Sequence, residues 1–182
     1  IIVAPSDHHI TDEEEFIEDA STLLDKAGEN DCLYTMGIRP TRPDTGYGYI
    51  QYETTEDTPS IDGIYKVRTF TEKPGLELAQ AFIDSGDFLW NSGIFVWSAR
   101  SIMAAFETYL PEVHIAFSEL TPYYYTDEEN EHLYGIYSSC VKESIDFGIM
   151  EKAHNVYVLP ATFGWCDLGT WRSLYEKLPK DY

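Results

Sequence analysis

The sequence IIVAPSDHHITDEEEFIEDASTLLDKAG (Ile1–Gly28) places a short apolar run directly before an amphipathic pattern. The β-branched residues at 1–3 predict a strand that leads into a Pro-Ser-Asp turn. Thr11 and Glu14 then form a capping-box signature, and apolar residues recur at helical spacing as far as Gly28. A strand followed by a helix of this kind indicates an α/β domain.

The rest of the chain repeats this alternation. We expect strands at 32–38, 48–51, 64–71, 92–97 and 155–159, with Asn91 opening the fourth of them. We expect helices over 76–86 and 102–110, from Thr126 onward, over 143–153 and from about Thr170 to the end, with a loop at 57–63. Strands that alternate with helices predict a sandwich with a mostly parallel or mixed sheet, and no internal repeat or long linker divides the chain.

Composition excludes several classes of protein. The 182 residues include 12 Lys and Arg against 32 Asp and Glu, a net charge of −20, so phosphodiester backbones would be repelled and nucleic acid is not an expected partner. No apolar stretch approaches the roughly 18 residues of a membrane span, and no secretory signal opens the chain. The three cysteines lie far apart without a CxxC spacing, which favours neither disulfides nor zinc and indicates a cytoplasmic protein.

Two aspartates are candidate metal ligands. Asp7 follows the first strand, and Asp167 lies in the late sequence GWCDLG (164–169), which also follows a predicted strand. Open α/β sheets place ligand groups beyond the carboxyl ends of their strands, and Mg²⁺ takes one or two carboxylates together with phosphate oxygens and water. The alternative is that Asp7 stabilises a turn and Asp167 caps a helix. A transition-metal site at His8 and His9 is less favoured, because neighbouring side chains point apart.

A second group of residues could bind a sugar phosphate. Lys73, held by the turn that follows it, can present a positive charge to an anion beside Glu72, although an exposed ion pair is the alternative. The amide of Asn91 could bond two neighbouring hydroxyls, or it could serve a turn at the strand start. Gly48, close to Gly46, would let the backbone approach a sugar ring, or it could belong to a simple hairpin. The four tryptophans suit a core and a binding platform equally.

Six motifs occur in an order that resembles the mannose-1-phosphate guanylyltransferases (GDP-mannose pyrophosphorylases). The resemblance covers nearly the whole chain and rests on PSDHHI (5–10), GYGYI (46–50), FTEKP (70–74), WNSGIF (90–95), SIDFGIMEK (144–152) and WCDLGTW (165–171). Related thymidylyl-, uridylyl- and adenylyltransferases share the Glu-Lys-Pro and a late Asp-x-Gly-Thr. They usually differ around the first metal-binding Asp and in the Asn-Ser-Gly segment.

The resemblance implies a Rossmann-like nucleotidyltransferase fold (GT-A-like), a three-layer sandwich with a mixed, mostly parallel sheet, with residues 1–182 forming part of one catalytic domain. The implied reaction converts GTP and mannose 1-phosphate into GDP-mannose and pyrophosphate. Such a reaction needs positioning and charge neutralisation more than a protein nucleophile. The site residues that the resemblance implies are Asp7 and Asp167 for Mg²⁺, Lys73 for the sugar phosphate, Glu72 and Asn91 for sugar hydroxyls, the Gly48 backbone for the sugar ring, and Asp146 in a supporting role.

The sequence departs from the family in one respect. The family's glycine-rich signature, which wraps the nucleotide triphosphate, precedes the Pro-Ser-Asp segment, whereas this sequence starts at Ile1 inside a predicted strand. We therefore expect a polypeptide that lacks the N-terminal nucleotide loop, is inactive by itself, and self-associates into a homo-oligomer through an exposed sheet edge.

Three alternatives stay open at this point. One is a nucleotidyltransferase for another base or hexose 1-phosphate, because base selection lies in the segment that we expect to be missing. Another is a catalytically silent homologue that serves as a regulatory subunit. The third is a metal-dependent glycosyltransferase, although such enzymes generally carry a close Asp-x-Asp pair after a strand, and the sequence has none in that setting.

Overall fold

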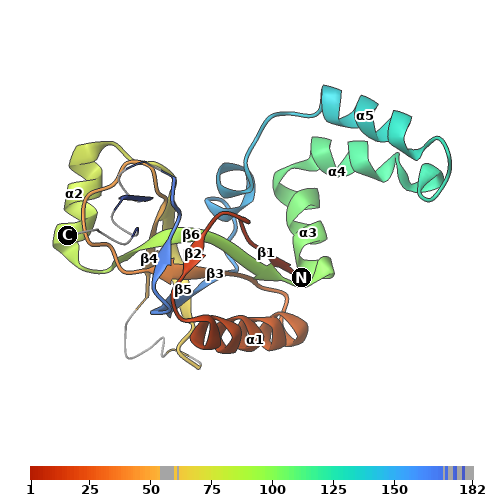
Figure 1. Ribbon diagram of the computed structural model, residues 1–182. Coiled ribbons are helices and arrows are strands. Elements are labelled where there is room, and N and C mark those ends of the chain that lie inside the picture. The colour runs from red at the N-terminus through yellow and green to blue at the C-terminus, as the bar shows by residue number, and fades with distance from the viewer. Residues whose placement is uncertain (54–59, 61, 170, 172–173, 176–177, 179–182) are drawn as a thin grey trace. The chain divides into compact units, whose positions relative to one another are not determined.

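The computed structural model describes residues 1–53, 60, 62–169, 171, 174, 175 and 178 (Figure 1). The chain divides into two compact units, one formed by Ile1–Ser98 with Asn155–Tyr182 and the other by Ala99–His154. The loop expected at 57–63 and the helix expected from Thr170 lie largely outside the described residues.

A six-stranded sheet forms the centre of the first unit, in the order β1-β6-β3-β7-β5-β4. A separate two-stranded ladder pairs β2 with β8. The strands are β1 (Ile2–Val3), β2 (His9–Ile10), β3 (Leu33–Ile38), β4 (Tyr49–Tyr52), β5 (Tyr65–Thr71), β6 (Phe88–Trp97), β7 (Val156–Ala161) and β8 (Trp165–Cys166). The strands predicted at 32–38, 48–51, 64–71 and 155–159 are thereby confirmed to within one or two residues at most ends.

The mixed α/β fold is confirmed, but the expectation of a mostly parallel sheet is wrong. Among the described strands only β3 and β7 pair in parallel, and the other pairings are antiparallel. The expectation assumed that each helix connects neighbouring parallel strands. Helix α2 (Leu76–Ser85) instead follows β5 and precedes β6, which are not neighbours in the sheet. Alternation along the chain therefore predicted the layers and not the strand directions.

Strand β6 begins at Phe88, so the expectation that Asn91 opens it is wrong. The three residues before Asn91 are buried and pair with β4, with Trp90 opposite Tyr49 and Leu89 opposite Ile50. On its other edge β6 pairs with β3, and near Val96 it also pairs with β1. Asn91 is therefore held inside a central strand, which fixes its side chain more firmly than a position at a strand start.

Strand β1 lies at the edge of the sheet, and its side chains are exposed. Ile2 is 39% exposed and Val3 46%, and Ile1, which precedes the strand, is 56% exposed. Because an apolar edge strand can pair with another chain, this edge is where the expected self-association would take place. That association stays a prediction.

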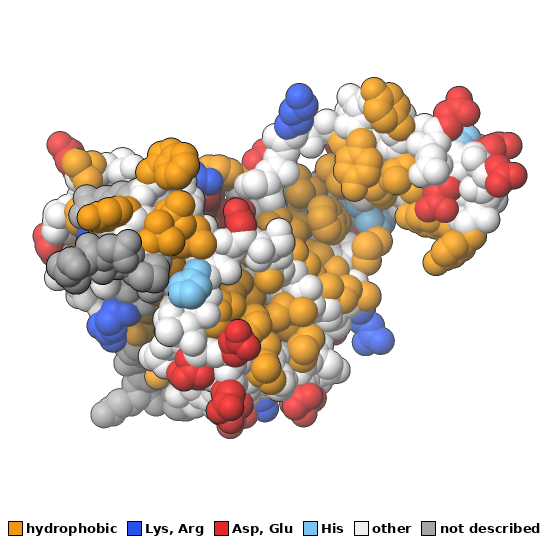
Figure 2. Space-filling view, viewed as in Figure 1, with side chains coloured by type: hydrophobic (Ala, Val, Ile, Leu, Met, Phe, Trp, Pro, Cys, Tyr) orange, Lys and Arg blue, Asp and Glu red, His pale blue; other side chains and the backbone are white. Residues whose placement is uncertain are grey.

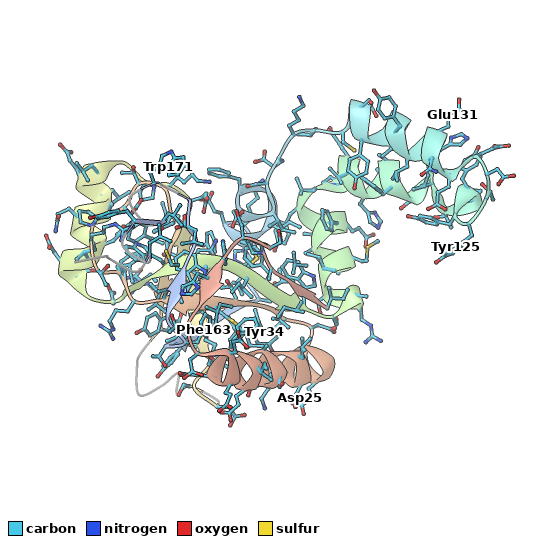
Figure 3. All side chains as sticks on the ribbon, in the orientation of Figure 1. Asp25, Tyr34, Tyr125, Glu131, Phe163 and Trp171 are labelled. Atoms are coloured by element: carbon cyan, nitrogen blue, oxygen red, sulfur yellow. The ribbon has the colours of Figure 1, made fainter. Side chains whose placement is uncertain are left out.

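Helix α1 (Glu13–Glu29) covers one face of the sheet (Figure 1). Its N-cap is Asp12, whose carboxylate accepts the backbone N–H of Glu15 at 3.1 Å, and not Thr11 as the capping box predicted. The Thr11 hydroxyl instead donates to the carbonyl oxygen of Gly164. Buried residues of α1 pack against Tyr34 and Phe163, which lie between the helix and the sheet (Figure 3).

The second unit is helical. It consists of α3 (Ala99–Tyr109), α4 (Pro111–Ser118), the 3₁₀ turn η1 (Thr121–Tyr123), α5 (Glu129–Ser139) and η2 (Asp146–Met150). The sequence did not predict α4, placed the start of α5 at Thr126, and expected an α-helix over 143–153 where the structure has a single π-helical turn. An apolar groove of about 470 Å³ lies within this unit, where Figure 2 shows hydrophobic side chains gathered.

None of the helices in the described part of the chain is both long and apolar enough to cross a membrane.

Candidate active site

The ladder between β2 and β8 brings two distant segments together. His9 pairs with Cys166 and Ile10 with Trp165 in antiparallel register, so His8, directly before His9, and Asp167, directly after Cys166, follow from the same end of the ladder. Burial lowers the pKa of His8, and the carboxylates of Asp7 and then Asp167 partly offset this by raising it. Both carboxylates therefore act electrostatically on one imidazole, although they stand near opposite ends of the sequence.

His8 itself is engaged within the protein. The indole N–H of Trp165 donates to Nδ1 of His8 at 3.0 Å, and the two rings meet edge-on with their centroids 5.2 Å apart. Because Nδ1 accepts this hydrogen bond, it is not open to a metal while the contact lasts. The contact fixes the orientation of the imidazole against Trp165.

The donor set at this place suits a hard divalent cation. Among the described residues no group of three or more His, Cys, Asp or Glu side chains could hold a metal ion. Zinc sites usually draw three or four ligands from the protein. Mg²⁺ keeps several waters and is often bound through one or two carboxylates together with phosphate oxygens. Two carboxylates are compatible with such a cation, and the roles of Asp7 and Asp167 as its ligands stay a prediction.

A second cluster forms where β4, β5 and β6 meet. A Cβ atom added to Gly48 would lie 2.4 Å from Oε2 of Glu72 and 3.2 Å from Cβ of Asn91. The backbone N–H of Asn91 donates to the Gly48 carbonyl oxygen at 2.8 Å. The Glu72 side chain is only 7% exposed. Two residues predicted to contact a sugar, Glu72 and Asn91, thus both lie against Gly48, the third.

The amide oxygen of Asn91 is held by contacts within the protein. Its Oδ1 atom lies 3.2 Å from the hydroxyl of the fully buried Thr35 and accepts the backbone N–H of Gly93, also at 3.2 Å. The same Thr35 hydroxyl lies 3.0 Å from the carbonyl oxygen of Ile94. The oxygen of the Asn91 amide is therefore engaged within the protein.

Lys73 is presented by an unusual backbone conformation. Its φ of +46° lies in the left-handed region that non-glycine residues rarely adopt, in the turn between β5, which ends at Thr71, and Pro74. Its Nζ atom lies 2.9 Å from Oε1 of Glu72, and the Lys73 side chain is 58% exposed. Such strain often accompanies functional sites. The structure shows the ion pair with Glu72, and the binding of an anion by Lys73 stays a prediction.

Asp146 belongs to the second unit, where it is the first residue of η2. Its supporting role stays a prediction.

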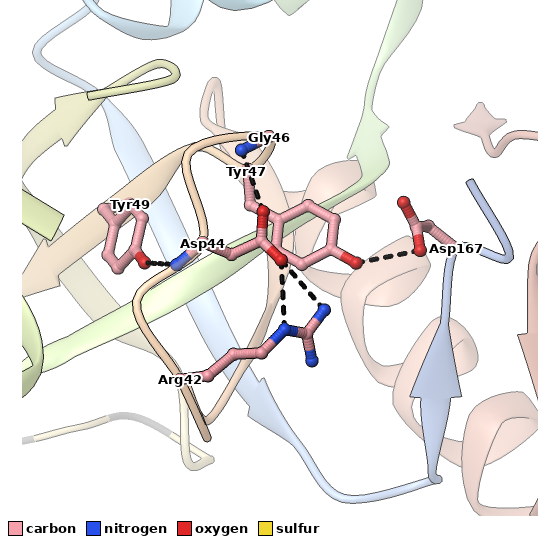
Figure 4. Close-up of polar contacts among 6 residues, drawn as sticks. All are labelled: Arg42, Asp44, Gly46, Tyr47, Tyr49 and Asp167. Atoms are coloured by element: carbon pink, nitrogen blue, oxygen red, sulfur yellow. Dashed lines mark hydrogen bonds and ion pairs between the residues drawn. The ribbon is translucent and has the colours of Figure 1, made fainter. Parts of the chain in front are cut away.

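The sequence analysis missed three residues of the site. The hydroxyl of Tyr47 donates to Oδ1 of Asp167 at 2.8 Å, and the ion pair between Arg42 and Asp44 lies beside Tyr47 (Figure 4). The flanking glycines drew attention to this segment for its backbone only. A side-chain contact that spans 120 residues leaves no local pattern in the sequence.

The fold and the matched residues define the class of protein. Residues 1–182 match the family model described as nucleotidyl transferase, and the chain belongs to that family. Over its whole length the chain is 34% identical to a mannose-1-phosphate guanylyltransferase of Escherichia coli and 38% identical to one of Salmonella montevideo. It is 35% identical to the xanthan biosynthesis protein XanB of Xanthomonas campestris pv. campestris. The chain spans 39% of the first two relatives and 38% of the third.

Solved structures agree with this family. A crystal structure described as mannose-1-phosphate geranyltransferase from Thermus thermophilus superposes with a TM-score of 0.83 at 34% identity, covering 99% of this chain and 50% of that one. A structure described as mannose-6-phosphate isomerase from Helicobacter pylori superposes with a TM-score of 0.70 at 27% identity, covering 91% of this chain and 63% of that one. The mixed α/β fold is therefore shared along nearly the whole described chain.

Proposed function

We propose that the protein to which this chain belongs transfers a guanylyl group from GTP to mannose 1-phosphate, which gives GDP-mannose and pyrophosphate. The observation that carries the proposal is the convergence of Gly48, Glu72 and Asn91 into one cluster with Lys73 at its exposed side. The names of the relatives, which are mannose-1-phosphate guanylyltransferases, support the choice of substrates.

The proposed roles follow from the chemistry of each group. The carboxylate of Glu72 would accept hydrogen bonds from sugar hydroxyls, and the Nδ2 group of Asn91 would donate to them. The missing side chain at Gly48 would let the backbone lie against the sugar ring. Lys73 would bring a positive charge to the sugar phosphate, which a protein of net charge −20 otherwise lacks there.

Asp7 and Asp167 would hold the divalent cation. When bound there, Mg²⁺ would neutralise phosphate charge and reduce the repulsion between the two anionic substrates. A phosphate oxygen of the sugar phosphate would attack the α-phosphorus of GTP in line with the departing pyrophosphate. The residues of this chain would then act by binding and orienting the sugar phosphate, with no covalent intermediate on the protein.

The test is calorimetric titration of the chain with GDP-mannose, in millimolar Mg²⁺ and again in a chelator. Binding that needs Mg²⁺ and is lost in both Asp7→Asn and Asp167→Asn is the expected result. Asp25→Asn is the matched control, because Asp25 is an exposed residue of α1 and the charge change is the same. Binding that survives in the two site variants, or that is equally strong for UDP-glucose, would contradict the proposal.

A further inference from the structure

Tyr47, in the loop before β4, contacts Asp167 through its side chain. Tyr47 donates its hydroxyl hydrogen to Oδ1 of Asp167 at 2.8 Å (Figure 4). The Tyr47 ring is in turn fixed by two tryptophans. It meets Trp90 at a centroid distance of 4.9 Å and Trp165 at 5.4 Å, both edge-on. Two such aromatic contacts leave the ring little freedom, so the position of the hydroxyl is set by packing.

An ion pair ties down the loop that carries Tyr47. Nε and Nη2 of Arg42 donate to Oδ2 of Asp44 at 3.1 and 2.8 Å, and the guanidinium lies over the rings of Trp90 and Tyr47 at 5.2 and 6.0 Å. Because guanidinium groups are planar, they can stack on an aromatic face while bonding a carboxylate. Arg42 therefore joins the loop, through Asp44, to Trp90 and to the Tyr47 ring.

Asp44 secures the same loop from the other side. Its Oδ1 accepts the backbone N–H of Gly46 at 2.9 Å, and its own backbone N–H donates to the hydroxyl of Tyr49 at 3.0 Å. Tyr49 is fully buried in β4. The segment from Arg42 to Tyr49 is thus attached to the core of the unit at both ends.

The other oxygen of Asp167 is confined as well. A Cβ atom added to Gly169 would lie 2.6 Å from Oδ2 of Asp167, so that oxygen packs close to the backbone two residues further on. Leu168, between them, has a φ of +51°. The Tyr47 donor on Oδ1 and the close backbone beside Oδ2 restrict the orientation of the carboxylate, whose oxygens have further lone pairs that a cation could use.

We propose that Tyr47 is a positioning residue that orients the Asp167 carboxylate toward a divalent cation, and that the Arg42–Asp44 ion pair holds Tyr47 in place for this purpose. The inference rests on the proposed function, because it assumes that Asp167 binds the cation. A phenol ordinarily titrates at about pH 10, so the Tyr47 hydroxyl has a hydrogen to donate to Asp167 at neutral pH.

The first test is the affinity for Mn²⁺ alone, as a Mg²⁺ substitute, in Tyr47→Phe. This change removes the hydroxyl and keeps the ring between its tryptophans. Removing the group that orients a metal ligand typically costs 10–100-fold in metal affinity, so we expect a loss of about tenfold. Tyr52→Phe is the matched control, because it deletes the same atom from a ring that packs on Tyr65. The unfolding temperature should be the same in both variants.

A double-mutant cycle separates positioning from a general structural effect. When Tyr47→Phe is added to Asp167→Asn, Mn²⁺ affinity should fall no further. When it is added to Asp7→Asn, Mn²⁺ affinity should still fall by about tenfold. A structural role would give the same loss in both backgrounds and lower the unfolding temperature. As a readout without metal, the ¹³Cζ signal of Tyr47, identified by its absence in Tyr47→Phe, should shift in Asp167→Asn and stay in place in Asp25→Asn.

The outcomes for the two proposals differ. If the wild-type chain binds GDP-mannose with Mg²⁺ and Tyr47→Phe binds Mn²⁺ equally well, the positioning role is overturned and the proposed function stands. An unchanged ¹³Cζ signal in Asp167→Asn overturns the positioning role in the same way. If the wild-type chain binds GDP-mannose with Mg²⁺ but does not bind Mn²⁺ alone, the positioning role is overturned and the proposed function stands.

Discussion

Gly48 is the residue at which the proposed sugar site has the least room. The Cβ atom of an alanine there would meet a nearly buried carboxylate at 2.4 Å, and Asn91 closes the other side at 3.2 Å. Glu72 would have to move, and with it the carboxylate that would bond the sugar. We therefore expect Gly48→Ala to weaken mannose 1-phosphate binding by at least about tenfold, since small displacements of positioning groups have large effects. Isothermal titration calorimetry measures this directly.

The control for this prediction is Gly75→Ala. Gly75 precedes α2 with a φ of −65°, and a Cβ atom there would have nothing within 4 Å. Alanine adopts that conformation without strain, so the control should bind as the wild type does. Equal affinity in Gly48→Ala and Gly75→Ala would show that the sugar does not lie against Gly48.

Also at the residue scale, the sequence pointed to those candidate site residues that lie in a recognisable local motif. Glu72 and Lys73 stand at a strand end before a Pro-Gly turn, and Gly48 lies in a glycine pair, so each could be found from its neighbours. Tyr47 could not, because the identity of its partner depends on the pairing of β2 with β8. The geometry of the candidate cation site thus depends on tertiary contacts that no local pattern encodes.

At the scale of elements, helix α1 contains an acidic residue in an unfavourable place. Oδ2 of Asp19 is buried and has no hydrogen-bond partner in the part of the chain that the structure describes. Burial, and then the charges of Glu15 and Glu18, raise the pKa of Asp19 from 3.8 to about 6. A folded-state pKa above the unfolded one means that the folded state binds the proton more tightly. The ionised Asp19 carboxylate therefore destabilises the fold. This destabilisation is absent below about pH 4, grows between about pH 4 and 6, and is complete above about pH 6.

We accordingly expect Asp19→Asn to raise the free energy of unfolding at about pH 7.5 by about 1 kcal/mol, a value reduced for the partial exposure of the side chain. At about pH 4 the gain should vanish. Urea unfolding at both pH values provides the measurement. Asp25→Asn, on the exposed side of the same helix (Figure 3), should show no such pH-dependent gain. A gain of equal size at the two pH values would contradict the assignment to the charge of Asp19.

Helices and strands with a clear repeat of apolar residues were predicted well. Elements whose extent depends on pairing with another part of the chain were not. The apolar spacing of α1 and the β-rich run of β3 gave their extents to within two residues, because each buries one face or is buried throughout. The start of β6 was missed because residues 88–90 are fixed by pairing with β4. The π-helical turn at 146–150 was also missed, because an apolar helical pattern does not distinguish π from α hydrogen bonding.

At the scale of the whole molecule, the net charge of −20 works against both folding and the binding of anionic substrates. Figure 2 shows many Asp and Glu side chains and few Lys and Arg on the visible face. Added salt should screen the repulsion and stabilise the chain, whatever the cation. A cation bound between Asp7 and Asp167 should add a second, specific effect that monovalent salt cannot reproduce.

The two effects can be separated by comparing Mg²⁺ with NaCl at matched ionic strength, in the presence of mannose 1-phosphate. Ligand binding to the folded state at about ten times its Kd stabilises by about 1.4 kcal/mol, so Mg²⁺ should raise the unfolding temperature beyond the NaCl control. Asp7→Asn and Asp25→Asn each remove one negative charge, and they should respond equally to NaCl. Only Asp7→Asn should lose the excess response to Mg²⁺. If both variants keep it, the cation binds elsewhere on this acidic chain, and the assignment of Asp7 as a metal ligand is wrong.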